Sequence, residues 1–283
     1  MPHRAARRAV LAALGAIVLW GSLASIVRGL SRWPPFLLAG SALLVGSLVS
    51  VPRIRQWRVP ARTLALGVYG LAGYHAALFF AFRLAPAVEA NLLNYLWPTF
   101  IVAFTPLLIP GMHLRAGHVV GTLAGLSGAA LIVTHGQLAL DHASLSGDLL
   151  AVLAAFLWAT YSLLCKRVPS FPDAAVGLFC AVSGGLSLFV HALLEPPYRP
   201  AAGEIAWLVV LGLGPMGAAF FLWNFAMTRG DPRTIGALSY LTPLLSTLLL
   251  TVVAGGTLTR LTALAGTLIV GGAVVGTLAS SRR

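Results

Sequence analysis

Charged residues are scarce in this sequence. Asp, Glu, Lys and Arg make up 9% of its 283 residues, against roughly 25% in an ordinary soluble domain, and the mean hydropathy is +0.90. A chain this apolar is not a soluble enzyme, a disordered protein or a nucleic-acid-binding module. The net charge of +12 is spread between long apolar runs, so the basic residues indicate membrane topology rather than contact with phosphate backbones.

Cysteine is nearly absent as well. Cys165 and Cys180 both lie inside apolar runs, which excludes a disulfide framework and a paired metal-ligand motif. The sequence also has no glycine-rich phosphate loop and no stretch long enough for a cytosolic ATPase domain, which excludes a primary pump within this chain. We therefore expect no metal and no cofactor.

Ten apolar runs fill most of the chain. A helix that crosses the hydrocarbon core needs about 20 mostly apolar residues, and long continuous runs favour helices over a barrel. The predicted spans cover roughly residues 9–29, 35–51, 63–83, 87–109, 116–134, 145–166, 174–194, 205–227, 234–254 and 261–279. The predicted fold class is an all-α polytopic membrane protein with ten transmembrane helices.

The basic residues are unevenly distributed over the connections between these spans. If the N-terminus is cytoplasmic, 14 of the 19 Lys and Arg residues fall on the cytoplasmic side. The other side keeps Arg28, Arg32, Arg83, Arg199 and Arg260. Because cytoplasmic loops carry an excess of Lys and Arg, both termini are predicted to be cytoplasmic, in agreement with an even number of spans.

Short sequence matches relate the two halves of the chain. Leu19-Trp20 and Arg28 match Leu157-Trp158 and Lys166 at an offset of 138 residues. At an offset of 145, Tyr95-Leu96-x-Pro98 recurs as Tyr240-Leu241-x-Pro243, and Gly121-Thr122-Leu123 recurs as Gly266-Thr267-Leu268. We expect two five-helix repeats, residues 1–138 and 139–283. Since five is odd, the second repeat is inverted, an arrangement typical of secondary transporters with a site near the membrane midplane.

Five motifs point to one family. They are Leu19-Trp20 with Arg28-Gly29, Pro52-Arg53-Ile54-Arg55-Gln56, Asn94-Tyr95-Leu96-Trp97-Pro98, Phe156-Leu157-Trp158-Ala159 with Tyr161, and Ser239-Tyr240-x-Thr242-Pro243. Together they resemble the EamA branch of the drug/metabolite transporter superfamily, and within it the bacterial exporters of aromatic amino acids. The resemblance covers essentially the whole chain. It implies two inverted five-helix repeats, a central cavity for a small organic substrate, and export from the cytoplasm.

The fourth span carries a polar stripe. Asn91, Asn94, Tyr95 and Pro98 follow an i, i+3, i+4, i+7 spacing, so they share one face of a helix, and Trp97 flanks it. Polar residues at membrane depth usually face protein or a water-filled cavity. Amide and phenol groups can donate and accept hydrogen bonds to a zwitterion without fixed charge. We predict that this face lines the cavity, with interhelical hydrogen bonding as the alternative.

Aromatic and amide side chains on other spans complete the predicted substrate site. They are Tyr74, His75 and Phe79 in the third span, Trp158 and Tyr161 in the sixth, and Trp223 and Asn224 in the eighth. An apolar, aromatic pocket with a few amides suits an aromatic side chain, although Trp and Tyr also form belts at membrane interfaces. The expected partners are an amino acid substrate and the lipid bilayer, and no nucleic acid.

Few titratable or helix-breaking residues lie inside the spans. His75 and Glu89 are candidate proton or amine sites; the alternatives are a neutral histidine bonded to a neighbouring helix and an acid stabilised by a helix start. Pro98 and Pro243 are candidate hinges, because a proline inside a helix kinks it, and a static bend is the alternative. Arg28 and Lys166 are interpreted as side chains that snorkel to the interface.

These observations predict a secondary transporter of the bacterial inner membrane. We expect it to export amino acids, aromatic and other apolar ones, by alternating access through a cavity between the repeats. Export of another small metabolite or a drug is the first alternative, with proton antiport or facilitated movement both open. An intramembrane enzyme is the second, less favoured because the sequence has no intramembrane acid cluster, metal-binding histidine set or catalytic loop motif.

Overall fold

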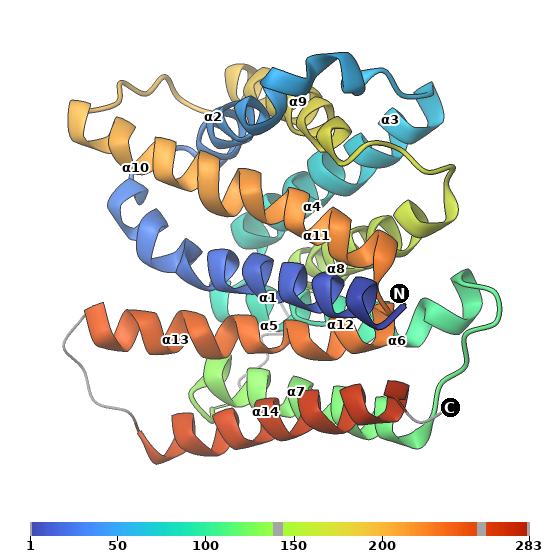
Figure 1. The fold of residues 1–283 in the computed structure, drawn as a ribbon. Helices are drawn as coiled ribbons and strands as arrows, with labels where there is room; N and C mark the ends of the chain where they lie inside the picture. The colour runs from blue at the N-terminus through green and yellow to red at the C-terminus, as the bar shows by residue number, and fades with distance from the viewer. Residues whose placement is uncertain (1, 138–143, 254–258, 282–283) are drawn as a thin grey trace.

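The computed structural model describes residues 2–137, 144–253 and 259–281, and every element among them is helical (Figure 1). Nine segments of these residues are long and apolar enough to cross a membrane: Arg4–Leu30, Pro35–Trp57, Ala61–Leu84, Ala116–Thr134, Leu145–Arg167, Asp173–Leu194, Ala202–Arg229, Pro232–Val253 and Arg260–Ser280. The tenth predicted span, 87–109, is present as two shorter helices, α5 (Ala87–Asn94) and α6 (Trp97–Leu108). The predicted all-α polytopic membrane fold is confirmed.

The remaining elements follow in chain order. The helices are α1 (Pro2–Val27), α2 (Pro35–Ser47), α3 (Ala61–Val68), α4 (Tyr74–Leu84), α7 (Ala116–Thr134), α8 (Leu145–Arg167), α9 (Val176–Leu194), α10 (Ala202–Leu213), α11 (Ala219–Arg229), α12 (Pro232–Ser239), α13 (Leu241–Val253) and α14 (Arg260–Ser281). Segments η1 (Arg28–Leu30), η2 (Leu48–Trp57) and η5 (Asp173–Ala175) are 3₁₀ turns, whereas η3 (Tyr69–Gly73) and η6 (Gly214–Ala218) are π-helices.

An offset of 145 residues carries the later elements of the first half onto those of the second. The π-helix η3 maps onto η6, α4 maps onto α11, and α5 maps onto α12, in each case with both ends agreeing to the residue. The internal repeat expected from three short motifs therefore extends to backbone irregularities that those motifs do not contain. The expected boundary between residues 138 and 139 lies outside the described residues.

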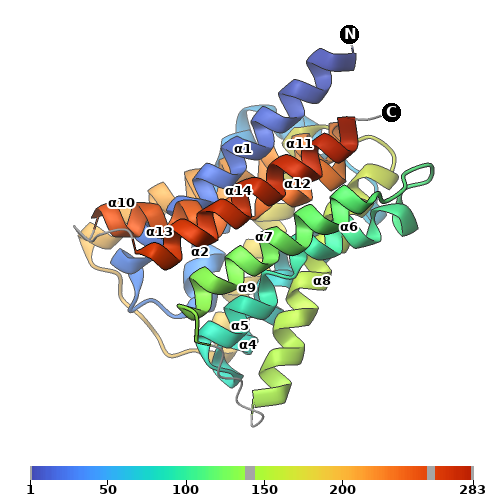
Figure 2. The ribbon, with the colours of Figure 1, turned by 90° about the horizontal axis from the view of Figure 1, so that it is seen from below.

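The two termini lie at the same face of the molecule (Figures 1 and 2). We call this the terminal face; α1 begins there, and α8 and α11 end there. The opposite face, here the far face, holds the ends of α1, α4 and α9. Two termini on one face are what an even number of membrane crossings requires.

The two repeats pack on each other through equivalent helices. The most extensive contacts join α7 to α14, which lie side by side at the bottom of Figure 1, and α2 to α9. Glycines bring these backbones together: a Cβ on Gly121 would lie 2.5 Å from the carbonyl oxygen of Gly272, and one on Gly184 would lie 2.9 Å from that of Gly40. Small residues allow such close approach of membrane helices.

The fourth and ninth spans are broken at equivalent places. Helix α5 ends before Tyr95 and α12 ends before Tyr240, and the chain resumes as α6 and α13. Pro98 and Pro243 lie in the first turns of these second half-helices, where a missing N–H costs little because that donor has no helical partner. The prolines thus sit beside a break rather than inside a continuous helix, and the hinge assignment stays a prediction.

Candidate substrate cavity

A cavity of about 550 Å³ lies between the repeats, within the usual size range of small-molecule sites. Toward the far face it is lined by exposed residues, among them Ser31, Phe82 and Arg83. Toward the middle of the molecule its lining consists of buried rings, including Trp97 and Trp158. The cavity is therefore open at the far face and ends on an aromatic floor.

Eight of the predicted substrate residues line this cavity. They are Tyr74, His75, Phe79, Asn91, Asn94, Tyr95, Trp97 and Trp158. They come from α4, from the two halves of the broken fourth span and the turn between them, and from α8, so residues far apart in sequence converge on one space. The geometry is compatible with substrate contact, which stays a prediction for each of them.

Three other predicted substrate residues do not line the cavity in this conformation. Tyr161 packs against the backbone of Gly70. Trp223 is buried beside Trp158, with ring centroids 6.1 Å apart. Asn224 donates to the carboxylate of Asp173 at 2.9 Å. All three lie toward the terminal face: Trp223 forms part of the aromatic floor, and Tyr161 and Asn224 lie on its closed side.

Several lining residues were not singled out as substrate contacts from the sequence: Trp20, Leu23, Val27, Arg83, Met216 and Thr242. The repeat offers a signal for one of them. Trp20 is the equivalent of Trp158, and the internal symmetry alone makes it a candidate. The aliphatic residues have no such signal, because nothing distinguishes them from lipid-facing neighbours in an apolar run.

Four indoles and one phenyl ring form the floor. Trp20 contacts the other three indoles, with centroid distances of 6.3 Å to Trp97, 5.7 Å to Trp158 and 5.2 Å to Trp223, and it lies 6.1 Å from Phe220. The first two contacts are close to perpendicular, at 82° and 77°, an arrangement that the ring quadrupoles favour. The floor is a packed aromatic layer from both repeats.

Each π-helix presents a backbone carbonyl to a ring that lines the cavity. The Leu71 carbonyl of η3 lies 2.7 Å from His75 Nδ1, and the Pro215 carbonyl of η6 accepts from Trp20 Nε1 at 3.1 Å. Because a carbonyl only accepts, this contact requires that Nδ1 of His75 carries a proton. The irregular backbone thus fixes the orientation of two cavity rings, in line with the frequent use of π-helical turns at functional sites.

Polar groups at the breaks in the fourth and ninth spans lack hydrogen-bond partners among the described residues. Asn94 Nδ2 donates to the Tyr74 hydroxyl at 3.3 Å, but its Oδ1 has no hydrogen-bond partner among the described residues. Thr242 Oγ1 in the ninth span also has no hydrogen-bond partner among the described residues. Pro98 cannot donate to the Asn94 carbonyl, since it has no N–H. Buried polar groups normally find a partner, so these atoms are available to water or to a ligand.

Glu89 lies apart from the cavity. Its side chain is buried, and one carboxylate oxygen accepts from the Ser144 hydroxyl at 3.2 Å, just before α8 begins. It occupies the first turn of α5, where the helix dipole favours an acid. His75 lines the cavity and Glu89 does not, so the two candidate proton sites do not share the cavity in this conformation.

At the far rim, Arg83 meets a buried carboxylate. Arg83 Nη2 lies 3.1 Å from Glu195 Oε1, and the Glu195 side chain has no exposed surface. The same carboxylate accepts from the backbone N–H groups of Phe36 and Leu37, at 3.0 and 3.1 Å, and from His191 Nδ1 at 2.9 Å. Glu195 therefore caps the start of α2, where free N–H groups and the helix dipole favour an anion.

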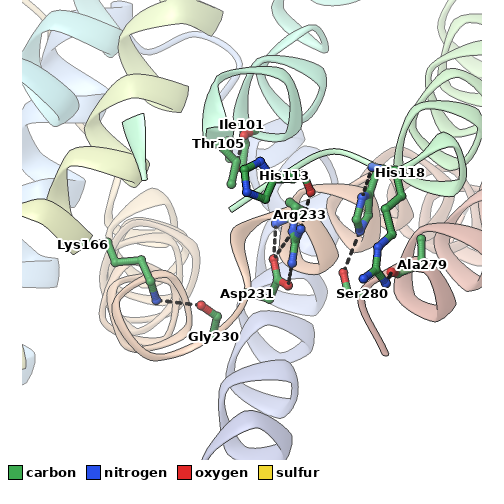
Figure 3. A network of polar contacts seen from close by, with 11 residues as sticks. Ile101, Thr105, His113, His118, Lys166, Gly230, Asp231, Arg233, Ala279 and Ser280 are labelled. Atoms are coloured by element: carbon green, nitrogen blue, oxygen red, sulfur yellow. Dashed lines mark hydrogen bonds and ion pairs between the residues drawn. The ribbon is translucent and has the colours of Figure 1, made fainter. Parts of the chain in front are cut away.

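The terminal face is closed by polar contacts between helices (Figure 3). Lys166 Nζ of α8 donates to the Thr228 and Gly230 carbonyls at the end of α11, at 3.2 and 2.8 Å. Lys166 was interpreted above as a snorkelling side chain; its ammonium instead caps a helix C-terminus, a favourable site for a cation. Its repeat equivalent Arg28 is exposed, as a snorkelling residue would be.

A second set of contacts joins the loop before α7 to the start of α12. Arg233 pairs with Asp231 at 2.7 Å and also donates to the His113 carbonyl (Figure 3). Burial acts to raise the pKa of Asp231, but hydrogen bonds from the side chain and backbone of Arg233 outweigh it and hold that pKa below its usual range. Arg229 pairs with Asp173 at 2.9 Å. No charged residue of this network lines the cavity among the described residues.

Comparison with known proteins gives consistent relatives. Residues 7–134 and 145–278 each match the EamA-like transporter family. The chain is 38% identical to the aromatic amino acid exporter YddG of Ancylobacter novellus, over 97% of this chain and 98% of that one. It is 29% identical to the aromatic amino acid exporter YddG of Salmonella typhimurium, over 86% and 87%. A solved crystal structure at 38% identity superposes with a TM-score of 0.91 and covers 97% of this chain and 99% of its own.

Proposed function

Because this chain belongs to the EamA-like transporter family, we propose that it exports amino acids, aromatic and other apolar ones, from the cytoplasm. The chain is a multi-pass membrane transporter and not an enzyme. One observation carries the choice of substrate: the cavity between the repeats is floored by Trp20, Trp97 and Trp158 and otherwise lined by few polar groups. Such a surface suits a flat ring through area burial and edge contacts.

The polar groups of the cavity support a zwitterionic rather than a purely apolar substrate. Asn91, Asn94, Tyr95 and Thr242 line it from the broken fourth and ninth spans. Their amides and hydroxyls both donate and accept hydrogen bonds. The relatives described above as aromatic amino acid exporters point to the same substrate class.

The charge distribution supports an orientation with the terminal face in the cytoplasm. Fourteen of the 19 basic residues, including Arg53, Arg55, Arg115 and Arg167, are assigned to the tails and connections on that face, and the cytoplasmic side carries such an excess. In the bacterial inner membrane the cavity then opens to the outside, and the contacts of Lys166 and Arg233 close the cytoplasmic side. In this proposal the conformation described here is outward-facing.

Transport in this proposal exchanges the conformations of the two repeats. Related repeats of opposite orientation can open one site to each side in turn. The breaks beside Pro98 and Pro243 lie at equivalent depths and are the proposed hinges. Tyr240, in the break of the ninth span, is hydrogen-bonded to Thr99 of α6, so the two broken spans are linked directly and can move together.

We propose facilitated movement down the substrate gradient rather than proton antiport. Glu89 faces Ser144 outside the cavity lining, and His75 is the single histidine among the described residues that line it. A proton pathway through the cavity would therefore depend on His75 alone. His75→Ala is expected to lower flux through lost ring contacts with Phe79 and Phe220, without changing the response to pH.

Counterflow into proteoliposomes tests the function. Vesicles preloaded with unlabelled amino acid are expected to take up labelled phenylalanine, tryptophan and leucine saturably, but not lysine. A pH gradient should leave the rates unchanged. Stimulation by the gradient would replace facilitated movement by proton antiport, with His75 and Glu89 as the next targets. Absence of exchange with every amino acid would overturn the substrate assignment and favour another metabolite or a drug.

Two substitutions test the placement of the site. Trp97→Ala and Tyr95→Ala are expected to raise the KM for phenylalanine, since both side chains line the cavity. Trp207→Ala is the matched control, because Trp207 is 47% exposed on α10 and does not line the cavity. Unchanged flux in folded Trp97→Ala and Tyr95→Ala proteins would move the site elsewhere.

A further inference from the structure

The cavity contains one fixed charge. Among the described residues that line it, Arg83 is the only Arg or Lys, and no Asp or Glu lines it. A zwitterionic amino acid that enters the cavity meets a formal counter-charge for its carboxylate and none for its ammonium group. Charge-assisted hydrogen bonds are roughly twice as strong as neutral ones, so the cavity favours the carboxylate over the amine.

Arg83 lies at the depth that this role requires. His75, Phe79 and Arg83 follow each other at four-residue intervals on α4 and all line the cavity, so they share one face. Eight residues of helix place Arg83 about 12 Å nearer the far face than His75. A ligand with its ring among Phe79 and the aromatic floor can therefore direct a carboxylate toward Arg83.

Arg83 can leave Glu195 for a substrate carboxylate, and Glu195 then keeps most of its hydrogen bonds. A guanidinium group has five N–H donors, and Glu195 receives one of them, from Nη2. Without Arg83, the Glu195 carboxylate still accepts from two backbone N–H groups of α2 and from His191. Arg83 is in addition half-exposed and lies 5.8 Å from the Phe36 ring centroid, which holds the guanidinium at the rim.

We propose that Arg83 binds the carboxylate of the substrate, and that an aromatic ring with a carboxylate is sufficient for transport. The chain then carries aromatic carboxylates that have no amino group, in addition to aromatic amino acids. This inference rests on the proposed function and names the chemical group of the substrate that the same cavity recognises. Aromatic amines, which present a cation to Arg83 and no carboxylate, are excluded.

The neutral polar groups explain why the amine is dispensable. Among the described residues that line the cavity, the side chains that can accept from an ammonium group, such as Asn91 and Ser31, are uncharged. These neutral side chains compensate only in part for the hydration that the ammonium group loses in the cavity. A substrate without the ammonium group avoids that desolvation cost. The carboxylate has no equivalent replacement, since no other Arg or Lys lines the cavity in the described part of the chain.

Three compounds separate the two charged groups of the substrate. Phenylalanine has both, 3-phenylpropanoate has only the carboxylate, and phenethylamine has only the ammonium group. In counterflow with the wild-type protein, phenylalanine and 3-phenylpropanoate are expected to exchange with KM values within about tenfold of each other, which corresponds to one neutral hydrogen bond. Phenethylamine is expected neither to exchange nor to compete. Vesicles without protein set the background, since the uncharged forms of these compounds cross membranes unaided.

Variants test whether Arg83 is the group responsible. Arg83→Gln should raise the KM for both carboxylates roughly tenfold to hundredfold, the loss of one charge-assisted hydrogen bond, with a smaller change in maximal rate. Arg83→Lys should raise the KM for both carboxylates less than Arg83→Gln does. Arg32→Gln is the matched control, because Arg32 lies at the same face, is 77% exposed and does not line the cavity.

Substitution of Glu195, the ion-pair partner of Arg83, distinguishes substrate binding by Arg83 from a purely structural role. Glu195→Gln keeps an acceptor for the α2 backbone but weakens the competing ion pair, so it should lower the KM for carboxylates. If the Arg83 to Glu195 contact only stabilised the fold, Glu195→Gln would impair transport in the same direction as Arg83→Gln. That result, or wild-type exchange of phenylalanine and phenethylamine without 3-phenylpropanoate, would overturn the inference. Failure of phenylalanine itself would instead overturn the proposed function.

Discussion

Gly121 and Gly272 lie in backbone contact where α7 crosses α14, and a Cβ on either residue would collide with the carbonyl oxygen of the other. The contact joins the last helix of one repeat to the last helix of the other. It leaves no room for any side chain, and in the bilayer close packing of this kind is a main source of helix association.

Gly121→Val is therefore expected to destabilise the protein. Overpacking of a tight contact typically costs about 1–3 kcal/mol, and here the obstructing atoms are backbone, which yields less than a side chain does. Thermal unfolding of the purified protein in detergent measures the effect. Gly271→Val is the matched control, because a Cβ there has no atom within 4 Å. Equal stability of the two variants would contradict the packing argument.

Lys166→Met is expected to loosen the closed terminal face. It removes both hydrogen bonds to the end of α11 and leaves the Thr228 and Gly230 carbonyls without that cation. The neighbouring thiol of Cys165, which is 5% exposed, reports the change through its rate of maleimide labelling. We expect the rate to rise about two- to tenfold. The effect is modest because solvent screens the contacts of a partly exposed charged group.

Arg167→Met is the control for that measurement, because Arg167 is exposed and adjacent in sequence. Cys180, which is completely buried, should label slowly in all three proteins. A labelling rate of Cys165 that is the same in Lys166→Met and in the wild type would show that the Lys166 contacts do not hold this face closed.

The pair of Asp231 and Arg233 predicts a pH dependence of stability. The pKa of Asp231 is lowered in the folded protein, so the carboxylate stabilises the fold at any pH above its unfolded value of about 3.9. This contribution is lost as the pH falls through the lower folded value. Melting temperatures measured between about pH 6 and pH 3 should fall more steeply for the wild type than for Asp231→Asn. Parallel curves would rule the contribution out.

Pro98→Ala is expected to slow transport. Alanine at this position restores an N–H that can donate to the Asn94 carbonyl, which favours one continuous helix over the broken span. A net hydrogen bond of about 0.5–1.5 kcal/mol would slow the rate-limiting change roughly two- to thirteenfold, with little effect on KM. Pro106→Ala, farther along α6, is the control. A rate equal to that of the wild type would leave the break without a role in movement.

Sequence reasoning reached the fold because the bilayer imposes a strong pattern. A span must be about 20 apolar residues long, so the ten apolar runs can be recognised directly in the sequence. The interruption of the fourth span was not predicted, although Pro98 is visible in it. A proline is compatible with a kink or with a new helix start, and the sequence alone does not distinguish the two.

The cavity lining was predicted best where one helix face carries the information. The stripe of Asn91, Asn94 and Tyr95 lines the cavity as the helical spacing indicates. Neither Tyr161, beyond the floor, nor Trp223, within it, lines the cavity. An aromatic residue in an apolar run gives no sign of whether it meets the cavity or another ring. Arg83 was assigned only to a membrane side, since its neighbour Glu195 is 112 residues away in the chain.

The crossing of α7 with α14, together with that of α2 with α9, makes the seam between the repeats resemble a subunit interface. Each half finds its principal packing partners in the other half rather than in the peptide link between them. The molecule is in this sense a dimer carried on one polypeptide. Two separately translated fragments, divided between residues 137 and 144, would then retain the surfaces needed to recognise each other in the membrane and assemble as a complementing pair.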